Sequence, residues 1–463
     1  MAGNADSLDV DALVDRAGGT VARGIFVDQA VFEAEQERIF TRAWLFVGHE
    51  SLIPKPDDFF VSRMGTESVV LTRDRGGQVH VLLNSCTHRG MKVCRYDQGN
   101  TRVFTCPYHG WSFATDGKLA ATPGALVGVP HFDRAYHGEL KRDDWGLVRA
   151  PRVALYKGTV WASWDPDAVE LTDYLGDMRL YLDFALDGRD GSPGGSVVVE
   201  GVQKWRVNAN WKFAPENFIG DMYHDISHRS VDLVGIGPSG GRGRRDNLRP
   251  RTTICFPGLG HGLIGEPPHT SEPPYVPAWK KYPEVEEYFR QVHERRVALL
   301  GERPRVTMSV GTIFPNMSFH GRQPRTIAVA HPISPTEMEM WRFCLIDADA
   351  PAAVNDAARH YFLRYSGPAG MTESDDLENW SYATEASRGP IARRQRYNYQ
   401  MGMGHARPVP GLRGAVENGE VTEENARAYY SRWSDFMRGD PWTPPAAEYV
   451  PMPEPARETE DAG

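Results

Sequence analysis

The sequence predicts an α+β protein in which a small all-β domain precedes a larger α+β domain with an antiparallel sheet. The chain has 463 residues, which is more than one hydrophobic core usually organises. Residues 44–164 alternate short strand-like runs with tight turns, and SVVLTRD (68–74) and QVHVLLN (78–84) form a hairpin pattern around a Gly-rich turn. Beyond residue 196, strand-like and helix-like segments follow one another. Two domains are therefore expected.

The elements of the larger domain follow a Gly/Pro/Asp-rich segment, residues 185–196, that is typical of a loop near a domain boundary. A strand is expected next, and then a helix that begins near Pro215, a residue suited to the first turn of a helix. The remaining segments predict strands over 197–207, 325–333 and 337–347, and helices over 283–301 and 373–389.

Composition narrows the possible functions. The net charge is −9 and the pI is near 5.9, so no general basic field exists for nucleic acid or an anionic membrane. The sequence begins MAGNADSLDVDALVD, without the basic and apolar regions of a signal peptide, and no apolar run reaches membrane-spanning length. We expect a cytoplasmic protein. Its five cysteines then favour metal binding or free thiols over disulfides.

Two Cys/His pairs form the first candidate site. Cys86 and His88 lie in SCTHRG, Cys106 and His109 lie in TCPYHGW, and residues 89–105 separate the pairs. Two thiolates and two imidazoles suit either zinc or an iron–sulfur cluster in which histidines replace two of the cysteines. Common zinc sites pair cysteine with cysteine and histidine with histidine, whereas each pair here is mixed. The pattern favours the cluster, with zinc as the alternative.

A second candidate site lies within NWKFAPENFIGDMYHDISHRS, residues 210–230. On a regular helix, Asp221, His224 and His228 would share one face because they are three and four residues apart. Two imidazoles and a carboxylate from elsewhere form the facial triad that binds non-haem iron and leaves positions open for O2. The alternative is a pair of surface histidines without a metal.

The first pattern resembles the Rieske [2Fe–2S] signature of aromatic-ring-hydroxylating oxygenases. The resemblance implies that Cys86 and Cys106 hold one iron and that His88 and His109 hold the other. Rieske proteins of respiratory complexes carry an additional cysteine in each loop, and these loops lack it. Cys94 is therefore read as a small buried thiol.

The second pattern resembles the mononuclear-iron segment of the same family. The resemblance implies that His224 and His228 are iron ligands and that Asp221 links a Rieske histidine of one subunit to the iron site of its neighbour. Asn217 and Phe218 would lie beside the iron and the substrate. Many relatives have four or five residues between the two histidines, and this chain has three.

The third iron ligand is expected in AGMTESDDLENW, residues 369–380, where the resemblance implies Asp376. A capping box between Thr372 and Asp375 would begin a helix here. The alternative for Asp375 and Asp376 is a solvated helix start that the helix dipole favours.

Resemblance over nearly the whole chain implies the large (α) subunit of a ring-hydroxylating dioxygenase. Residues 1–42 would be an N-terminal helical segment packed on the catalytic domain, 43–165 the Rieske domain, and 166–463 a helix-grip catalytic domain with the mononuclear iron. It also implies a ferredoxin and/or reductase that delivers electrons from NAD(P)H, and a small β subunit in an α3β3 assembly.

The implied reaction, in aromatic hydrocarbon catabolism, is cis-dihydroxylation of an arene by O2. The substrate would be a polycyclic aromatic hydrocarbon in a pocket lined by Phe218, Met222 and Met371, or an aromatic carboxylate such as phthalate. Arginines of the loop 235–250 could bind such a carboxylate, although an exposed loop is the plainer interpretation; they are Arg242, Arg244, Arg245 and Arg249. The alternatives are a monooxygenase or demethylase, an electron-transfer module, and a zinc-containing binding protein.

Overall fold

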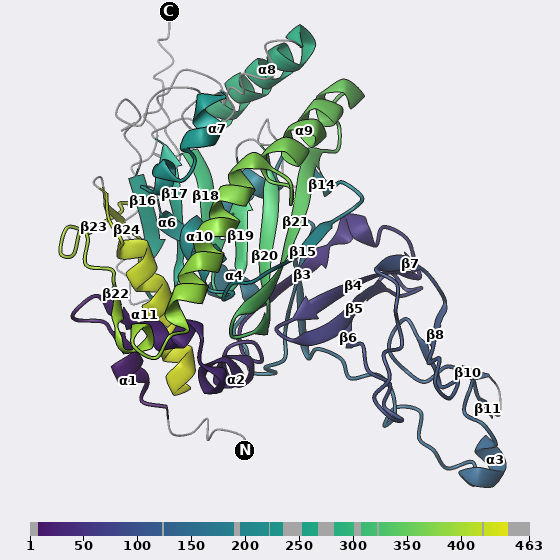
Figure 1. The fold of residues 1–463 in the computed structure, drawn as a ribbon. Helices are drawn as coiled ribbons and strands as arrows, with labels where there is room; N and C mark the ends of the chain where they lie inside the picture. The colour runs from purple at the N-terminus through teal and green to yellow at the C-terminus, as the bar shows by residue number, and fades with distance from the viewer. Residues whose placement is uncertain are drawn as a thin grey trace, which may run out of the picture. The chain divides into compact units, whose positions relative to one another are not determined.

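The computed structural model describes residues 8–122, 125–188, 195–221, 223–234, 252–266, 282–300, 307–321, 324–418 and 421–442. The chain divides into two compact units: one comprises Gln36–Leu171, and the other comprises Met1–Glu35 with Thr172–Gly463. The first is built mainly of short antiparallel strands, and the second has a long antiparallel sheet with helices, as Figure 1 shows. The predicted α+β class is confirmed.

The unit of residues 36–171 contains several small antiparallel sheets. The predicted hairpin is present, because β5 (Glu67–Arg73) pairs with β6 (Val79–Leu83). Its sheet has the order β6-β5-β4-β7, with β4 at Asp58–Met64 and β7 at Gln98–Asn100. The other strands are β3 (Leu45–His49), β12 (Arg152–Tyr156) and β13 (Thr159–Ser163) in one sheet, and β8 (Val103–Thr105) with β9 (Ser112–Ala114) in another. The loops that follow β6 and β8 carry the Cys/His pairs.

The sheet of the second unit has ten strands in the order β14-β21-β20-β19-β18-β17-β16-β24-β23, with β15 also paired to β21. The predicted strand 337–347 is β21 (Glu337–Asp347). The predicted strand 197–207 is split into β14 (Ser196–Val198) and β15 (Gln203–Val207). The other strands are β16 (Thr252–Phe256), β17 (His261–Glu266), β18 (Thr307–Ile313), β19 (Met317–His320), β20 (Thr326–Ser334), β23 (Arg407–Pro408) and β24 (Val416–Asn418).

Helices of this unit place the candidate residues against the sheet. α6 (Phe213–Gly220) packs on β17, β18 and β19, and α11 (Glu424–Arg438) packs against α6, β16 and β17. α10 (Met371–Ser387) carries the candidate carboxylates. The other long helices are α8 (Pro283–Leu300) and α9 (Ala352–Tyr365). The helices predicted over 283–301 and 373–389 are α8 and α10, whereas α9 was not predicted. Among the helices that the structure describes, none is long and apolar enough to cross a membrane.

A buried ion pair ties the N-terminal segment to the rest of the second unit. Glu35, on α2 (Gln29–Arg38), accepts hydrogen bonds from Lys212 Nζ at 2.6 Å and from the indole N–H groups of Trp211 and Trp433 at 2.8 Å each. Glu35 and Lys212 are both fully buried. Three donors on one carboxylate satisfy the hydrogen-bonding needs of a charge that would otherwise be costly to bury.

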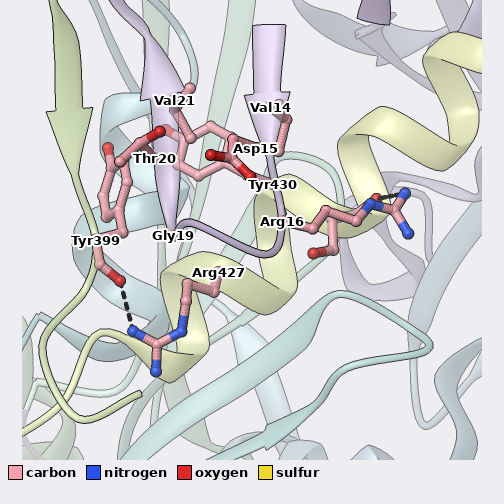
Figure 2. Close-up of a pocket in the computed structure, with 10 residues that line it drawn as sticks. Val14, Asp15, Arg16, Gly19, Thr20, Val21, Tyr399, Arg427 and Tyr430 are labelled. Carbon is pink, nitrogen blue, oxygen red and sulfur yellow. Dashed lines mark hydrogen bonds between the residues drawn. The ribbon is translucent and has the colours of Figure 1, made fainter. Parts of the chain in front are cut away.

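The N-terminal hairpin of β1 (Val14–Asp15) and β2 (Thr20–Ala22) lines a small pocket with α11 (Figure 2). Both arginines that line the pocket donate hydrogen bonds to neighbouring groups: Arg427 donates to the carbonyl of Tyr399, and Arg16 donates to Ser434. None of the candidate site residues lines this pocket, whose lining is Val14, Asp15, Arg16, Gly19, Thr20, Val21, Tyr399, Arg427, Tyr430 and Ser431.

Candidate metal centres

The two Cys/His loops have the same backbone turn. The N–H of Gly90 donates to the carbonyl of Cys86 at 2.8 Å, and the N–H of Gly110 donates to that of Cys106 at 3.0 Å. Each cysteine N–H donates in turn to the carbonyl five residues later, at 2.8 Å. The glycines have φ values of +75° and +83°, a left-handed conformation that other residues rarely adopt. The glycine in each motif thus allows the tight turn that presents the side chains.

The four side chains of these loops form one cluster. Both cysteines are buried, and burial together with the adjacent Cys106 thiol raises the pKa of Cys86. The rings of His88 and His109 have centroids 4.7 Å apart, and His88 stacks on Trp111 at 4.9 Å. Nδ1 of His88 is buried without a hydrogen-bond partner among the described residues. Two facing thiols and an unpartnered imidazole nitrogen suit a metal cluster.

The segment that carries the histidines is not the regular helix that the spacing predicted. α6 ends at Gly220, residues His224–Ile226 form a 3-10 turn, η5, and α7 begins at Arg229. The prediction of one shared helix face for Asp221, His224 and His228 is therefore wrong.

The helix ends because a residue distant in sequence replaces its next hydrogen bond. Asn425 Nδ2, on α11, donates at 2.6 Å to the carbonyl of Ile219, which in a continuing helix would accept from the N–H four residues later. A Cβ at Gly220 would lie 2.6 Å from the Cβ of Asn425, so the close packing also requires glycine there.

The irregular segment nevertheless brings the expected donors together. Nε2 of His224 lies 3.5 Å, and Nε2 of His228 lies 3.4 Å, from Oδ1 of Asp376. One donor atom from each residue lies within 4.8 Å of the others. Oδ1 of Asp376 is buried and has no hydrogen-bond partner in the described part of the chain. Two imidazoles and one carboxylate with this arrangement fit a mononuclear iron site.

The other nitrogen of each imidazole donates to an acceptor directly after α6 or on α10. Nδ1 of His224 donates to the main-chain carbonyl of Asp221 at 2.7 Å, and Nδ1 of His228 donates to Oδ2 of Asp375 at 3.1 Å. These bonds fix the tautomers and leave both Nε2 atoms directed at Asp376. The expected Thr372–Asp375 capping box is wrong, because α10 begins at Met371 without a side-chain cap and Thr372 Oγ1 donates to the carbonyl of Tyr365. The sequence analysis therefore missed the role of Asp375.

Electrostatics at this site favour a cation. Burial alone would lower the pKa of His224, but the carboxylates of Asp221 and Asp376 raise it to about 9. The pKa of Asp376 is raised, because the effect of burial exceeds the opposing effects of His224, His228 and Arg342. A bound metal ion would take the place of the imidazole proton that this acidic environment stabilises.

The main-chain carbonyl of Asp221 lies closer to the His224 imidazole than its carboxylate does. Its carboxylate Oδ1 is 3.4 Å from Nδ1 of His224, farther than its own main-chain oxygen. That Oδ1 atom is buried and unpartnered within the described residues. The expected hydrogen bond from the imidazole is thus accepted by the main-chain carbonyl, and the carboxylate contributes its charge at a longer distance.

The remaining expected residues have different environments. Phe218 is buried, with its ring 5.3 Å from that of His320 and 5.8 Å from that of Trp380. Asn217 is half-buried on α6, and Met371 is 38% exposed at the start of α10. Met222 and the loop arginines Arg242, Arg244, Arg245 and Arg249 lie outside the described residues.

A further acidic group that the sequence analysis did not single out lies on α6. Glu216 accepts hydrogen bonds from the hydroxyls of Tyr399, at 3.0 Å, and Tyr430. Burial raises its pKa to about 7, although both tyrosines oppose the rise and the charges of Asp221 and Glu423 add to it. Its partners come from distant parts of the chain, so no local sequence pattern indicates this cluster.

Comparisons with known proteins identify the two domains that carry these sites. Residues 43–132 match the family described as Rieske [2Fe-2S] domain, and residues 192–439 match the ring hydroxylating alpha subunit catalytic domain. Biphenyl 2,3-dioxygenase subunit alpha of Rhodococcus jostii (strain RHA1) is 38% identical, over 94% of this chain and 92% of the relative. N,N-dimethyl phenylurea N-demethylase subunit alpha of Sphingobium sp. (strain YBL2) is 31% identical, over 94% and 96%.

Solved structures give the same assignment. The crystal structure of naphthalene 1,2-dioxygenase from Rhodococcus sp. bound to indole matches with a TM-score of 0.80 and 35% identity, covering 94% of this chain and 99% of that chain. A Rieske domain and this catalytic domain imply a [2Fe–2S] cluster and a mononuclear iron, which the donor sets described above fit. The chain therefore belongs to the family of Rieske non-haem iron ring-hydroxylating dioxygenase alpha subunits.

Proposed function

We propose that this chain is the terminal oxygenase that converts an arene, O2, NAD(P)H and a proton into a cis-dihydrodiol and NAD(P)+. The observation that supports the proposal best is the convergence of His224, His228 and Asp376, with both Nδ1 atoms already held by other acceptors. Residues 43–165 would be the Rieske domain and 166–463 the catalytic domain, with 1–42 as an N-terminal segment packed on the latter.

In this proposal Cys86 and Cys106 ligate one cluster iron, and His88 and His109 ligate the other. When bound, the mononuclear iron supplies the binding and reduction of O2, and the cluster supplies electrons. The protein positions these groups rather than performing the redox chemistry itself. A ferredoxin and/or reductase would donate the electrons, a β subunit would complete an α3β3 assembly, and the enzyme would act in the cytoplasm.

The surrounding residues have distinct positioning roles in the proposed reaction. The main-chain carbonyl of Asp221 and the carboxylate of Asp375 hold the two imidazoles so that each Nε2 faces the iron position. The Asp221 carboxylate, whose buried Oδ1 lies 3.4 Å from Nδ1 of His224 and makes no hydrogen bond among the described residues, would link the site to a Rieske histidine of the neighbouring subunit. Asn217 and Phe218 would lie beside the iron and the substrate.

A neutral arene is the favoured substrate class. The names of two relatives given above refer to biphenyl and naphthalene, which carry no charge. The buried arginine beside Phe218 is Arg342, and its guanidinium is paired with Glu373 at 2.6 Å. That pairing disfavours its use as a receptor for the carboxylate of a substrate such as phthalate. Phe218 and Met371 are the described members of the proposed apolar pocket.

Product analysis tests the proposal. Chemically reduced protein would be exposed to isotopically labelled O2 with naphthalene, biphenyl or phthalate, and the products identified by mass spectrometry. We expect a cis-dihydrodiol that contains two labelled oxygen atoms from a neutral arene and no product from phthalate. A second candidate, oxidative N-demethylation, is supported by the dimethyl phenylurea demethylase relative. Release of formaldehyde from an N-methyl arylurea, with no dihydrodiol from any arene, would favour that reaction and contradict ours.

A further inference from the structure

A buried arginine connects the two segments that carry the candidate iron ligands. Arg342 lies on β21 and is 1% exposed. Its Nη2 donates to Oε2 of Glu373 at 2.6 Å, and its Nη1 donates to Oγ1 of Thr326 at 3.3 Å. Glu373 is 2% exposed and lies one helical turn before Asp376 on α10. The ion pair therefore fixes the turn of α10 that leads to the ligand carboxylate.

The same guanidinium contacts the segment that leads to the histidines. Its central carbon lies 4.8 Å from the ring centroid of Phe218, on α6, in a cation–π arrangement. The Phe218 ring also forms T-shaped contacts with Trp380, one turn after Asp376 on α10, and with His320 on β19. Phe218 is thus enclosed by β21, α10 and β19, and Arg342 is the charged member of the enclosure.

Burial of the Arg342–Glu373 ion pair costs free energy that an apolar pair would not. Burying an ion pair removes two charges from water, and a well-packed apolar pair at the same place is often as stable or more stable. Nε of Arg342 and Oε1 of Glu373 are in addition buried without hydrogen-bond partners among the described residues. Burial raises the pKa of Glu373 to about 7 even though Arg342 opposes the rise. General stability therefore does not account well for the pair.

We propose that Arg342 is a positioning residue of the mononuclear site: through Glu373 it sets the position of Asp376, and through its contact with Phe218 it sets the ring beside the substrate. This inference rests on the proposed function of His224, His228 and Asp376. The charge and the planar shape of the Arg342 side chain both contribute, because the flat guanidinium can lie on an aromatic face while it donates to a carboxylate.

Metal binding tests the inference separately from activity. The mononuclear metal would be removed by a chelator from protein with an intact cluster, and Co(II) binding would be measured by equilibrium dialysis. We expect Arg342→Met to raise the Co(II) dissociation constant roughly tenfold, at the lower end of what loss of an outer partner of a metal ligand costs. Arg342→Lys, which keeps a positive charge opposite Glu373, should give an intermediate value.

Arg325→Met is the matched control. Arg325 is another buried arginine paired with a carboxylate, Asp347 Oδ1 at 3.1 Å, but it contacts neither Phe218 nor Glu373 in the contacts described here. We expect it to lower thermal stability and leave Co(II) affinity unchanged. Unchanged affinity in both Arg342 variants, or equal weakening by Arg325→Met, would overturn the inference. If the unaltered protein bound no Co(II), or if His224→Ala did not abolish binding, the proposed metal site itself would be wrong.

The isomer ratio of the product provides a second readout. Loss of the guanidinium beneath Phe218 should change the ratio of dihydrodiol isomers formed from a substituted arene, whereas Arg325→Met should not change it. A ratio that is the same in Arg342→Lys, Arg342→Met and the unaltered protein would contradict the part of the inference that concerns Phe218.

Discussion

Replacing Asp221 with asparagine separates the two roles that we propose for its main-chain carbonyl and its carboxylate. The main-chain carbonyl holds His224 at 2.7 Å and is unchanged by the substitution, whereas the carboxylate, 3.4 Å away, loses its charge. Iron content should therefore stay within about twofold of the unaltered protein. Turnover should fall by about 100-fold, the upper end of the effect expected when an outer partner of a metal ligand is altered.

The assay combines metal analysis with a single turnover. Iron and the visible spectrum of the cluster would be measured first, and product formation from naphthalene and O2 would then be followed after chemical reduction of the cluster. Asp375→Ala is the contrasting control, because there the side chain itself accepts from His228 at 3.1 Å, so its removal should weaken iron binding. Normal turnover in Asp221→Asn would refute the linking role of its carboxylate, and loss of iron would refute the positioning role of its carbonyl.

Three further perturbations test other parts of the structure. Cys106→Ser should abolish acid-labile sulfide and visible absorption. Cys94→Ser should keep both, because the Cys94 thiol is directed at the main-chain carbonyl of Tyr96. A cluster retained in Cys106→Ser would contradict the assignment of Cys106 as a ligand. The pKa of Glu216 is raised to about 7, so its protonated form stabilises the fold at acid pH and this stability is lost as the pH rises from about 4.5 to 7. Chemical denaturation should therefore show that the free energy of unfolding of Glu216→Gln rises, relative to that of the unaltered protein, by on the order of 2–3 kcal/mol across that range. A difference that does not depend on pH would contradict this expectation. Lys212→Met should lower the free energy of unfolding by about 3–5 kcal/mol, since it leaves a buried carboxylate without its cation; a loss below about 1 kcal/mol would show that the indole donors suffice.

Local sequence patterns were sufficient for several regular elements and for the turns of the Cys/His loops. The alternation of apolar residues in EMEMWRFCLID predicts β21 over the residues that the structure gives it, and the amphipathic run from Pro283 predicts α8. Each Rieske loop contains its own turn glycine, so a few adjacent residues determine the geometry of the loop.

The mononuclear site depended on interactions that are distant in sequence. The i, i+3 and i+7 spacing from Asp221 to His228 is that of a helix, but the helix ends at Gly220 because Asn425, on α11, takes the carbonyl of Ile219. Asp375 was expected to cap its own helix, and it instead accepts from His228. Neither partner can be found by a local pattern, since each joins segments that are brought together only by the folded sheet and its helices.

The central claim is that this chain holds a Rieske cluster and a separate mononuclear iron. It is tested most directly by measuring iron, zinc and acid-labile sulfide per chain in the purified protein, together with its visible spectrum. We predict about three irons and two sulfides per chain, with the absorption of an iron–sulfur cluster. Zinc without sulfide, in a colourless protein, would contradict the account.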